Sequence, residues 1–337
     1  MPRIFPGPAA MAKATFLLVV FLQFFLLTTT YGASIAKRNS PPAGALIVKP
    51  KGDKNKGEFS KIQDAVDSLP KDGSSQVIYI YAGTYKEQVS ISSGGPLTII
   101  GQTSDSSIYS GNTVTITHSS SQGQTGNDDA TGTLRVHRDN FKLYNINLKN
   151  TFGQASSGGQ ALALSAYGKN QGFYGVAMYS YQDTVLVNTG SQFFGKCYIE
   201  GAVDYIFGQH ARSFFHKCKL SSIGAGSITA HGPSASDNSI RKGDLTGKVY
   251  LGRPWSEYAH VGYTSCTLGD LINGAGWSQW QNGDPRTGHV QFVEYQSSGA
   301  GASGTRAIGK RVNNNAGYTI DDVLGGSWQQ WVDTSYY

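Results

Sequence analysis

The sequence predicts an all-β solenoid, a fold in which short strands and turns coil around one long axis. The 337-residue chain contains 43 glycines and only 15% charged residues, a composition typical of many short strands joined by tight turns. Apolar runs of strand length follow one another without helical patterns of crossover length, which disfavours a doubly wound α/β sheet. A Phe-led motif also recurs at Phe173, Phe193 and Phe214, with spacings of 20 and 21 residues. This period suits one solenoid coil, whereas a propeller blade needs roughly twice that length.

Residues 1–33 are predicted to be a secretory signal peptide. Arg3 and Lys13 precede an apolar stretch over residues 14–27, and small and polar residues follow as far as Ala33. A transmembrane anchor is the alternative, because the stretch is long for a signal core, but Gln23 interrupts it. We therefore expect a secreted, extracellular protein with no membrane attachment after cleavage.

Residues 34–45, rich in Ser, Pro and Ala, are predicted to be a linker or short propeptide that leads into the domain at 46–337. The pair Lys37-Arg38 is either a dibasic processing site or an ordinary feature of a flexible tail. Residues 1–38 contain four basic and no acidic residues, so their removal leaves 24 basic and 22 acidic residues, a net charge of +2 instead of +6. This small excess, without a Lys/Arg run, argues against nucleic-acid binding.

An amphipathic helix is expected before the strands. Between Glu58 and Leu69 the apolar residues fall on one helical stripe, and Pro70 marks the end. The stripe consists of Phe59, Ile62, Ala65, Val66 and Leu69. Such a helix can cap the open end of a stack of coils.

The expected strands begin at Val77, and Gly, Ser and Asn separate them. The first runs are 77–81, 97–100, 114–117 and 141–148. Near the C-terminus, the motifs Gly276–Trp280 and Ser327–Trp331 favour a tail packed on the solenoid through aromatic rings, with sugar-binding platforms as the alternative.

Three cysteines, Cys197, Cys218 and Cys266, are too few to stabilise an exported domain by disulfides. The repeat places Ala177, Cys197 and Cys218 on one ladder that faces inward. We expect buried thiols, with an inter-coil disulfide as the less favoured alternative. A metal site is not expected, because no supporting His lies at ligand spacing.

The same period brings polar residues together. Gln160, Gln182 and Asp204 are 22 residues apart, and Asp183 lies beside Gln182. Since adjacent coils are separated by roughly 4.8 Å, two amides and two carboxylates would meet on one outer patch. A surface ladder of polar side chains is the alternative, but four such residues in register favour a functional site.

Paired carboxylates suit acid and nucleophile chemistry. Like charges raise the pKa of one carboxyl group, and a neighbouring Arg keeps the other ionised. Arg253, in Leu251-Gly-Arg-Pro-Trp255, is a candidate for that cation.

Five ordered motifs resemble those of the pectin methylesterase family, over about residues 59–280. They are Gly83-Thr-Tyr-Lys-Glu87, Gln160-Ala-Leu-Ala-Leu164, Gln182-Asp-Thr184, Asp204-Tyr-Ile-Phe-Gly208 and Leu251-Gly-Arg-Pro-Trp255. The resemblance implies a right-handed single-stranded parallel β-helix of the pectin-lyase-like kind. It also implies a cofactor-free hydrolase that releases methanol from galacturonate methyl esters in cell-wall pectin, and we expect a monomer.

Position by position, the resemblance implies that Asp204 is the nucleophile and that Asp183 protonates the departing methanol and then activates water. Gln160 and Gln182 would stabilise the oxyanion, and Arg253 would hold the Asp204 carboxylate.

Two aromatic residues, Trp255 and Phe207, would offer apolar faces to sugar rings, with core packing as the alternative for Phe207. Many relatives have an aromatic residue where this chain has Leu186, so one sugar contact is expected to be missing. Tyr205 replaces a common Phe. These variants, and the absence of a plant-type inhibitor-like domain, resemble fungal members of the family.

Three other functions compete with the esterase. A pectin lyase or polygalacturonase would usually need a different set of acidic and basic residues. A Ser-His-Asp esterase lacks support, because the sequence has no Gly-x-Ser-x-Gly motif. A non-catalytic pectin-binding protein would be expected to have lost an acid or amide position, and none is lost.

Overall fold

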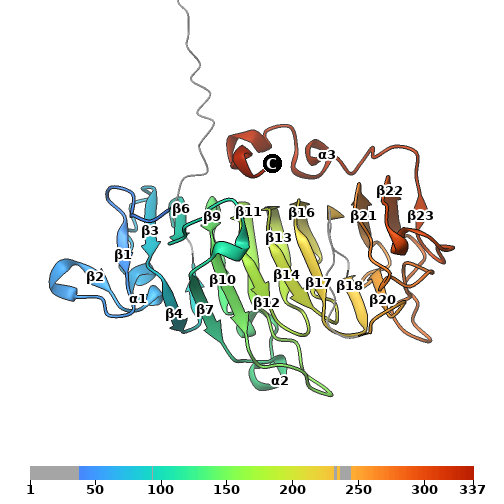
Figure 1. Cartoon of the computed structure of the whole chain (residues 1–337), viewed down its shortest axis with the longest axis horizontal. Coiled ribbons are helices and arrows are strands. Elements are labelled where there is room, and N and C mark those ends of the chain that lie inside the picture. The colour runs from blue at the N-terminus through green and yellow to red at the C-terminus, as the bar shows by residue number, and fades with distance from the viewer. Residues whose placement is uncertain (1–37, 93, 231–233, 236–243) are drawn as a thin grey trace, which may run out of the picture. The chain divides into compact units, whose positions relative to one another are not determined.

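The computed structural model describes residues 38–92, 94–230, 234–235 and 244–337, all within one compact unit (Figure 1). The predicted signal peptide over residues 1–33 and the first part of the 34–45 segment lie outside the described residues. Within the described ranges, no helix is long and apolar enough to cross a membrane.

Two parallel sheets run along the described unit. The larger sheet has 17 strands and the smaller has 6 in the described ranges. The smaller sheet contains β4 (Gly83–Lys86), β7 (Val114–His118), β10 (Ile146–Asn150), β12 (Ala177–Tyr179), β14 (Tyr198–Gly201) and β17 (Lys219–Ser222). The strand-to-strand pairings of both sheets are parallel, for example β10 with β12 and β11 with β13, so each coil adds strands beside those of the coil before it (Figure 1). This confirms the parallel β-helix.

The larger sheet carries the longest strands in the middle of the molecule. In chain order its strands are β1 (Leu46–Val48), β2 (Glu58–Phe59), β3 (Gln76–Ile80), β5 (Val89–Ile91), β6 (Leu97–Gly101), β8 (Leu134–Val136), β9 (Phe141–Tyr144), β11 (Leu164–Tyr174), β13 (Val185–Gly195), β15 (Ile206–Phe207), β16 (His210–His216), β18 (Gly226–Ala230), β19 (Ser234–Ala235), β20 (Val249–Arg253), β21 (His260–Thr264), β22 (Gln291–Tyr295) and β23 (Lys310–Arg311). The α-helices of the described residues are α1 (Ile62–Asp67), α2 (Gln122–Thr125) and α3 (Ile320–Leu324). Short 3₁₀ helices lie at Lys54–Lys56, Tyr109–Gly111, Asp129–Thr131, Ala300–Ala302, Trp328–Gln330 and Thr334–Tyr336.

The coil period corrects the predicted repeat by one residue. Phe173 pairs with Phe194, and Phe194 with Phe215, so each of these steps is 21 residues. Their rings stack in the core with centroids 4.7 and 4.3 Å apart. The Phe-Phe dipeptides of the later motifs allow two alignments. The predicted repeat aligned Phe173 with Phe193, whereas the backbone pairing aligns Phe173 with Phe194.

The cysteine ladder shifts accordingly. Ala177 pairs with Tyr198, and the Tyr198 amide bonds to the Val176 carbonyl, so Val176 and not Ala177 lies beside Cys197. Cys197 and Cys218 do share the ladder, and the three cysteines, all within the described residues, are buried and form no disulfide there. The prediction of buried core thiols is therefore confirmed.

A single left-handed residue turns the chain from the larger sheet to the smaller one. Asn145, Gly175, Lys196 and Lys217 follow the ends of β9, β11, β13 and β16 and have φ angles of 52°, 58°, 53° and 51°. This turn explains why the predicted strand over 141–148 divides at Asn145 into β9 and β10. Asn and Gly tolerate this conformation best.

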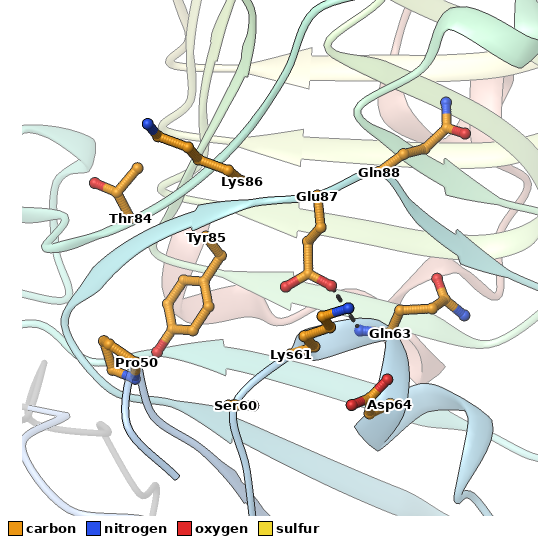
Figure 2. Close-up of a pocket in the computed structure, with 10 residues that line it drawn as sticks. All are labelled: Pro50, Ser60, Lys61, Gln63, Asp64, Thr84, Tyr85, Lys86, Glu87 and Gln88. Atoms are coloured by element: carbon orange, nitrogen blue, oxygen red, sulfur yellow. Dashed lines mark hydrogen bonds between the residues drawn. The ribbon is translucent and has the colours of Figure 1, made fainter.

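The N-terminal helix is shorter than predicted. Glu58 and Phe59 form β2 and pair with β1, so α1 begins only at Ile62. The helix has no cap from its own Lys61 side chain, but the Glu87 carboxylate accepts hydrogen bonds from the Ile62 and Gln63 amides at 2.9 and 3.0 Å. Figure 2 shows Glu87 beside Gln63. Glu87 of the Gly83–Glu87 motif therefore fixes the cap of the solenoid, because an anion stabilises a helix N-terminus.

The C-terminal segment packs across the ends of the central strands, as Figure 1 shows for the red tail. An aromatic cluster joins it to the larger sheet and contains Tyr144, Tyr174, Phe193, Phe214, Ile320, Trp328, Val332 and Tyr336. Trp277 is buried in the main core. For Trp277 and Trp328, the favoured prediction of packing is confirmed.

Candidate active site

The two candidate carboxylates lie side by side on adjacent coils. Val185 pairs with Ile206, and the Asp183 amide bonds to the Val203 carbonyl. Asp183 therefore aligns with Asp204, while Gln182 pairs with Val203 in an isolated bridge. The predicted 22-residue column is corrected to a 21-residue step, which places carboxylate next to carboxylate.

Both aspartates have a left-handed backbone, with φ of 62° at Asp183 and 50° at Asp204. Each lies just before a strand, β13 and β15 respectively, so the turn that starts the strand also carries the side chain. Asp is among the residues that tolerate this conformation. The two residues are 7% and 5% exposed, so the pair is largely screened from bulk water.

Arg253, at the end of β20, binds Asp204 in a fork. Its Nε donates to Oδ1 at 2.9 Å, and its Nη2 donates to Oδ2 at 2.6 Å. Burial raises the pKa of Asp204, and the hydrogen bonds and positive charge of Arg253 act against that rise. Such a fork holds a carboxylate in one orientation and favours its ionised form.

Asp183 has the opposite environment. Burial, together with the negative charges of Asp204 and Asp128, raises the pKa of Asp183 well above its ordinary value. Arg253 and a hydrogen bond from Gln182 lower it, but they do not offset the burial. The pair is therefore electrostatically unlike: one carboxyl is held by a cation, and the other favours the protonated form.

Gln182 interacts with this pair, and Gln160 lies on the preceding coil. The Gln182 side chain hydrogen-bonds the Asp183 carboxyl, and a Cβ added to Gly159 would lie 3.3 Å from Gln182 Oε1. Gln182 therefore reaches the coil that carries Gln160. Among the described residues, the Gln160 Oε1 atom is buried without a hydrogen-bond partner, so this end of its carboxamide is not committed to the protein.

The aromatic candidates belong to a small apolar cluster outside the main core. Leu162, Leu186, Phe207 and Ala230 form its buried part, and Trp255 packs against them. The Phe207 and Trp255 ring centroids are 5.9 Å apart. Phe207 is only 2% exposed, which favours the packing alternative for its ring, whereas Trp255 is half-buried and accessible.

Sequence reasoning did not predict that Asp128 is a neighbour of the pair, and it considered Trp280 only as a packing residue or a sugar platform. Asp128 follows α2 in an ordinary polar loop, yet its charge acts on Asp183. Trp280 approaches from a distant loop and accepts a hydrogen bond at its carbonyl from Arg253 Nη1, at 3.1 Å. Asp128 and Trp280 lie before and after the segment with the regular 21-residue repeat. Their sequence positions therefore do not indicate that they lie near the site.

A Ser, an Asp and a His also meet near the loop of Asp128. Ser165 Oγ donates to Asp129 at 2.7 Å, and His137 Nε2 is 2.9 Å from the same carboxylate. Asp129, not His137, is the central member, and Ser165 is fully buried. The order differs from that of a nucleophilic triad, in which His lies between Ser and Asp.

Two grooves are lined by residues of the candidate site other than the two aspartates. One, of about 270 Å³, is lined by Arg253, Tyr250, Ser278 and Trp280 among others. The other, of about 720 Å³, is lined by Trp255, Glu257, Asp284 and Arg286 among others. A separate pocket around Glu87 (Figure 2) has none of the candidate catalytic residues in its lining. Arg253 and Trp255 therefore each line a groove that is open to a ligand.

Comparison with known proteins gives a consistent result. Residues 47–322 match the Pectinesterase family model. A pectinesterase of Aspergillus niger is 42% identical over 322 residues, covering 90% of this chain and 95% of the relative. A pectinesterase of Aspergillus aculeatus is 41% identical, covering 90% and 96%.

Solved structures agree with this. The crystal structure of the pectin methylesterase from Aspergillus niger superposes with a TM-score of 0.81 at 39% identity, covering 89% of this chain and all of that one. The pectin methylesterase from carrot gives a TM-score of 0.73 at 25% identity, covering 88% and 98%.

Proposed function

Because this chain belongs to the pectinesterase family and is a carboxylic ester hydrolase, we propose that it de-esterifies methylated homogalacturonan with Asp204 as nucleophile and Asp183 as general acid and base. The observation that carries this proposal is the unlike carboxylate pair. Arg253 grips Asp204 in a fork, and burial beside two other carboxylates favours the protonated form of Asp183.

In the first half of the reaction, the Asp204 carboxylate attacks the methyl ester carbonyl. The carbonyl oxygen becomes an oxyanion, to which the Gln160 and Gln182 amides donate hydrogen bonds. The carbon–oxygen bond to methanol then breaks, and Asp183 gives its proton to the leaving methoxide. The product of this half is an anhydride between Asp204 and the galacturonyl carboxyl group.

In the second half, the ionised Asp183 takes a proton from water, and the hydroxide attacks the galacturonyl carbonyl of the anhydride. Asp204 leaves as a carboxylate, which Arg253 again binds. Asp183 is reprotonated, so one water is consumed and one methanol and one free uronic acid are formed.

Substrate binding is assigned to the groove beside the pair. The half-buried Trp255 would offer its face to a sugar ring, and Phe207 would support Trp255 from below. In this proposal the protein is a secreted monomer of the extracellular space or cell wall, and its binding partner is pectin. The signal peptide that would direct secretion lies outside the described residues.

The test is the release of methanol from methylated pectin. Asp204→Asn should abolish it almost completely, and Gln182→Ala should reduce kcat roughly a hundredfold or more, the loss typical of an oxyanion donor. Asp67→Asn, exposed on α1, and Gln330→Ala, exposed in the tail, are matched controls that should retain the wild-type rate.

The products distinguish the rival functions. A lyase would form an unsaturated sugar, and a polygalacturonase would form new reducing ends. Either product without methanol would reject the esterase, and a fully active Asp204→Asn protein would reject the proposed nucleophile.

A further inference from the structure

Two guanidinium groups share one indole ring next to the carboxylate pair. The Cζ atoms of Arg253 and Arg286 lie 4.4 and 4.9 Å from the centre of the Trp280 ring. Each cation also has its own carboxylate, since Arg253 binds Asp204 and Arg286 Nε binds Asp284 Oδ2 at 2.8 Å. A continuous chain of contacts therefore runs from Arg286 through Trp280 to the proposed nucleophile.

The loop geometry makes Arg286 the fixed end of this chain. The Trp280 amide bonds to the Pro285 carbonyl at 3.1 Å, which closes a tight loop from Trp280 to Arg286. Arg286 has a left-handed backbone with φ of 51°, an unusual conformation for Arg. Its Nη1 also donates to the Trp255 carbonyl at 2.5 Å. One side chain thus contacts both tryptophans of the site.

The plane of Arg253 must be fixed for its fork to work. Two parallel hydrogen bonds to a carboxylate require the guanidinium and the carboxylate to be nearly coplanar. The Trp280 ring face and carbonyl both contact Arg253, and an aromatic face restrains the plane of a stacked guanidinium. Anything that holds Trp280 therefore holds the Arg253 fork.

We propose that Arg286 is a positioning residue of the esterase: through Trp280 it aligns Arg253 with Asp204, and through the Trp255 carbonyl it fixes the substrate-facing side of the same site. This inference rests on the proposed roles of Asp204 and Arg253. Arg286 lines the 720 Å³ groove. Its proposed role is to position Arg253, and it requires no contact with the two aspartates or with the substrate.

The expected signature is a change in pH dependence. Arg253 is the charged group that acts on Asp204, and Asp204, Asp128 and Arg253 act on Asp183. If Arg253 loses its alignment, its hydrogen bonds no longer oppose the effect of burial, and the pKa of Asp204 rises. The nucleophile then ionises only at higher pH, so the acidic limb of the kcat profile moves to higher pH.

The experiment compares Arg286→Gln, Arg286→Lys, Trp280→Phe and the Arg286→Gln/Trp280→Phe double variant in methanol release across pH. Arg286→Gln should lower kcat about tenfold, as expected for a displaced catalytic group, and should move the acidic limb upward while KM changes less. Arg286→Lys should restore only part of kcat, because an ammonium has no planar face to stack. Arg212→Gln, exposed on β16, is the control and should leave both readouts unchanged.

The double variant tests the route through Trp280. If Arg286 acts through that ring, the double variant should lose little more than the worse single variant, because residues in one contact chain are not additive. Multiplicative losses, an unchanged pH profile, or an effect confined to KM would each overturn the proposal. Should Arg286→Gln fail to fold, Trp280→Phe alone must still move the acidic limb.

Asp204→Asn in the same series separates the two proposals. An inactive Asp204→Asn protein beside a wild-type Arg286→Gln profile would reject only the role of Arg286. An active Asp204→Asn protein would reject the proposed catalytic mechanism itself.

Discussion

At the scale of single residues, the site combines features that oppose stability. Asp183 and Asp204 have left-handed backbones, are nearly buried, and lie beside each other on neighbouring coils. Left-handed conformations and buried like charges both cost free energy and persist where the surrounding structure enforces them. Here the enforcing structure is the coil register, together with the fork from Arg253.

This opposition predicts that Asp183→Asn gives a more stable but inactive protein. The pKa of Asp183 is higher in the folded state than in the unfolded state. Its favourable contribution to the free energy of unfolding is therefore fully present at a pH below the pKa of the unfolded state, and it is lost as the pH rises through the pKa of the folded state. Above that range the folded protein must carry a buried, ionised Asp183. The neutral Asn avoids this charge and tolerates the left-handed backbone, so we expect a gain of roughly 1 kcal/mol or more at neutral pH.

Chemical unfolding at several pH values tests this prediction. The gain should vanish in acid, where Asp183 is protonated in both states. If the variant is only as stable as wild type at neutral pH, or less stable, burial and the neighbouring carboxylates do not raise the pKa of Asp183 as proposed.

How much of the site the sequence predicts depends on the repeat. Gln160, Gln182, Asp183, Asp204 and Arg253 all lie in motifs with recognisable spacing. The last four interact with one another in the structure, whereas Gln160 is placed only on the preceding coil. Asp128 and Arg286 act on the site from loops of irregular length. No sequence period connects such loops to the coils, so their approach depends on tertiary packing alone.

At the scale of secondary structure, a one-residue left-handed turn follows the larger-sheet strands β9, β11, β13 and β16. It recurs after β21 and β22 at Ser265 and Gln296, with φ of 54° and 49°. Glycine occupies the equivalent place at Gly175 without strain. At the other positions the left-handed conformation costs conformational free energy, which contacts with neighbouring residues must offset.

Ser265 offers a test of this turn, because its side chain is exposed. Ser265→Gly should be neutral or stabilising by about 0.5 kcal/mol, since glycine removes the left-handed strain but gains entropy in the unfolded chain. Ser265→Val should destabilise by roughly 1 kcal/mol or more, because a β-branched residue is a genuine outlier there. Thermal unfolding of the two variants measures this difference in stability. A Val variant as stable as the Gly variant would show that the left-handed turn does not constrain this position.

The elements also show why sequence reasoning erred by single residues. The adjacent Phe193 and Phe194 made two registers equally plausible, and only backbone pairing distinguishes them. The stripe from Phe59 to Leu69 has helical spacing throughout, yet β1 recruits Glu58 and Phe59 into a parallel pair. Pairing with a neighbour outweighed local periodicity in that case.

At the scale of the whole domain, the two ends of the described chain meet. Arg38 lies over the Tyr144 ring, at 4.2 Å, and near the Tyr336 ring, at 5.9 Å. Its Nη1 donates to Asn145 Oδ1 at 2.7 Å, and its carbonyl accepts a hydrogen bond from the Tyr79 hydroxyl. Arg38 therefore joins the C-terminal tail to the larger sheet. Cleavage after Lys37-Arg38 would remove this residue.

We predict that a chain beginning at Ser34 is more stable than one beginning at Asn39, by roughly 1–2 kcal/mol, the combined scale of a cation–π contact and a charged hydrogen bond. Chemical unfolding of both chains measures the difference. Arg38→Ala in the longer chain should reproduce most of the loss. Equal stability of the three proteins would mean that Arg38 does not fasten the tail.

The central claim is that two aligned aspartates carry unlike protonation states, and infrared spectroscopy of the carboxyl groups tests it most directly. Difference spectra of wild type and Asp183→Asn across pH should show a protonated carboxyl band from Asp183 that persists well above the ordinary titration range of Asp. The corresponding Asp204→Asn difference should show an ionised carboxylate over the pH range of activity. An Asp183 that is ionised throughout that range in the active enzyme would contradict the account.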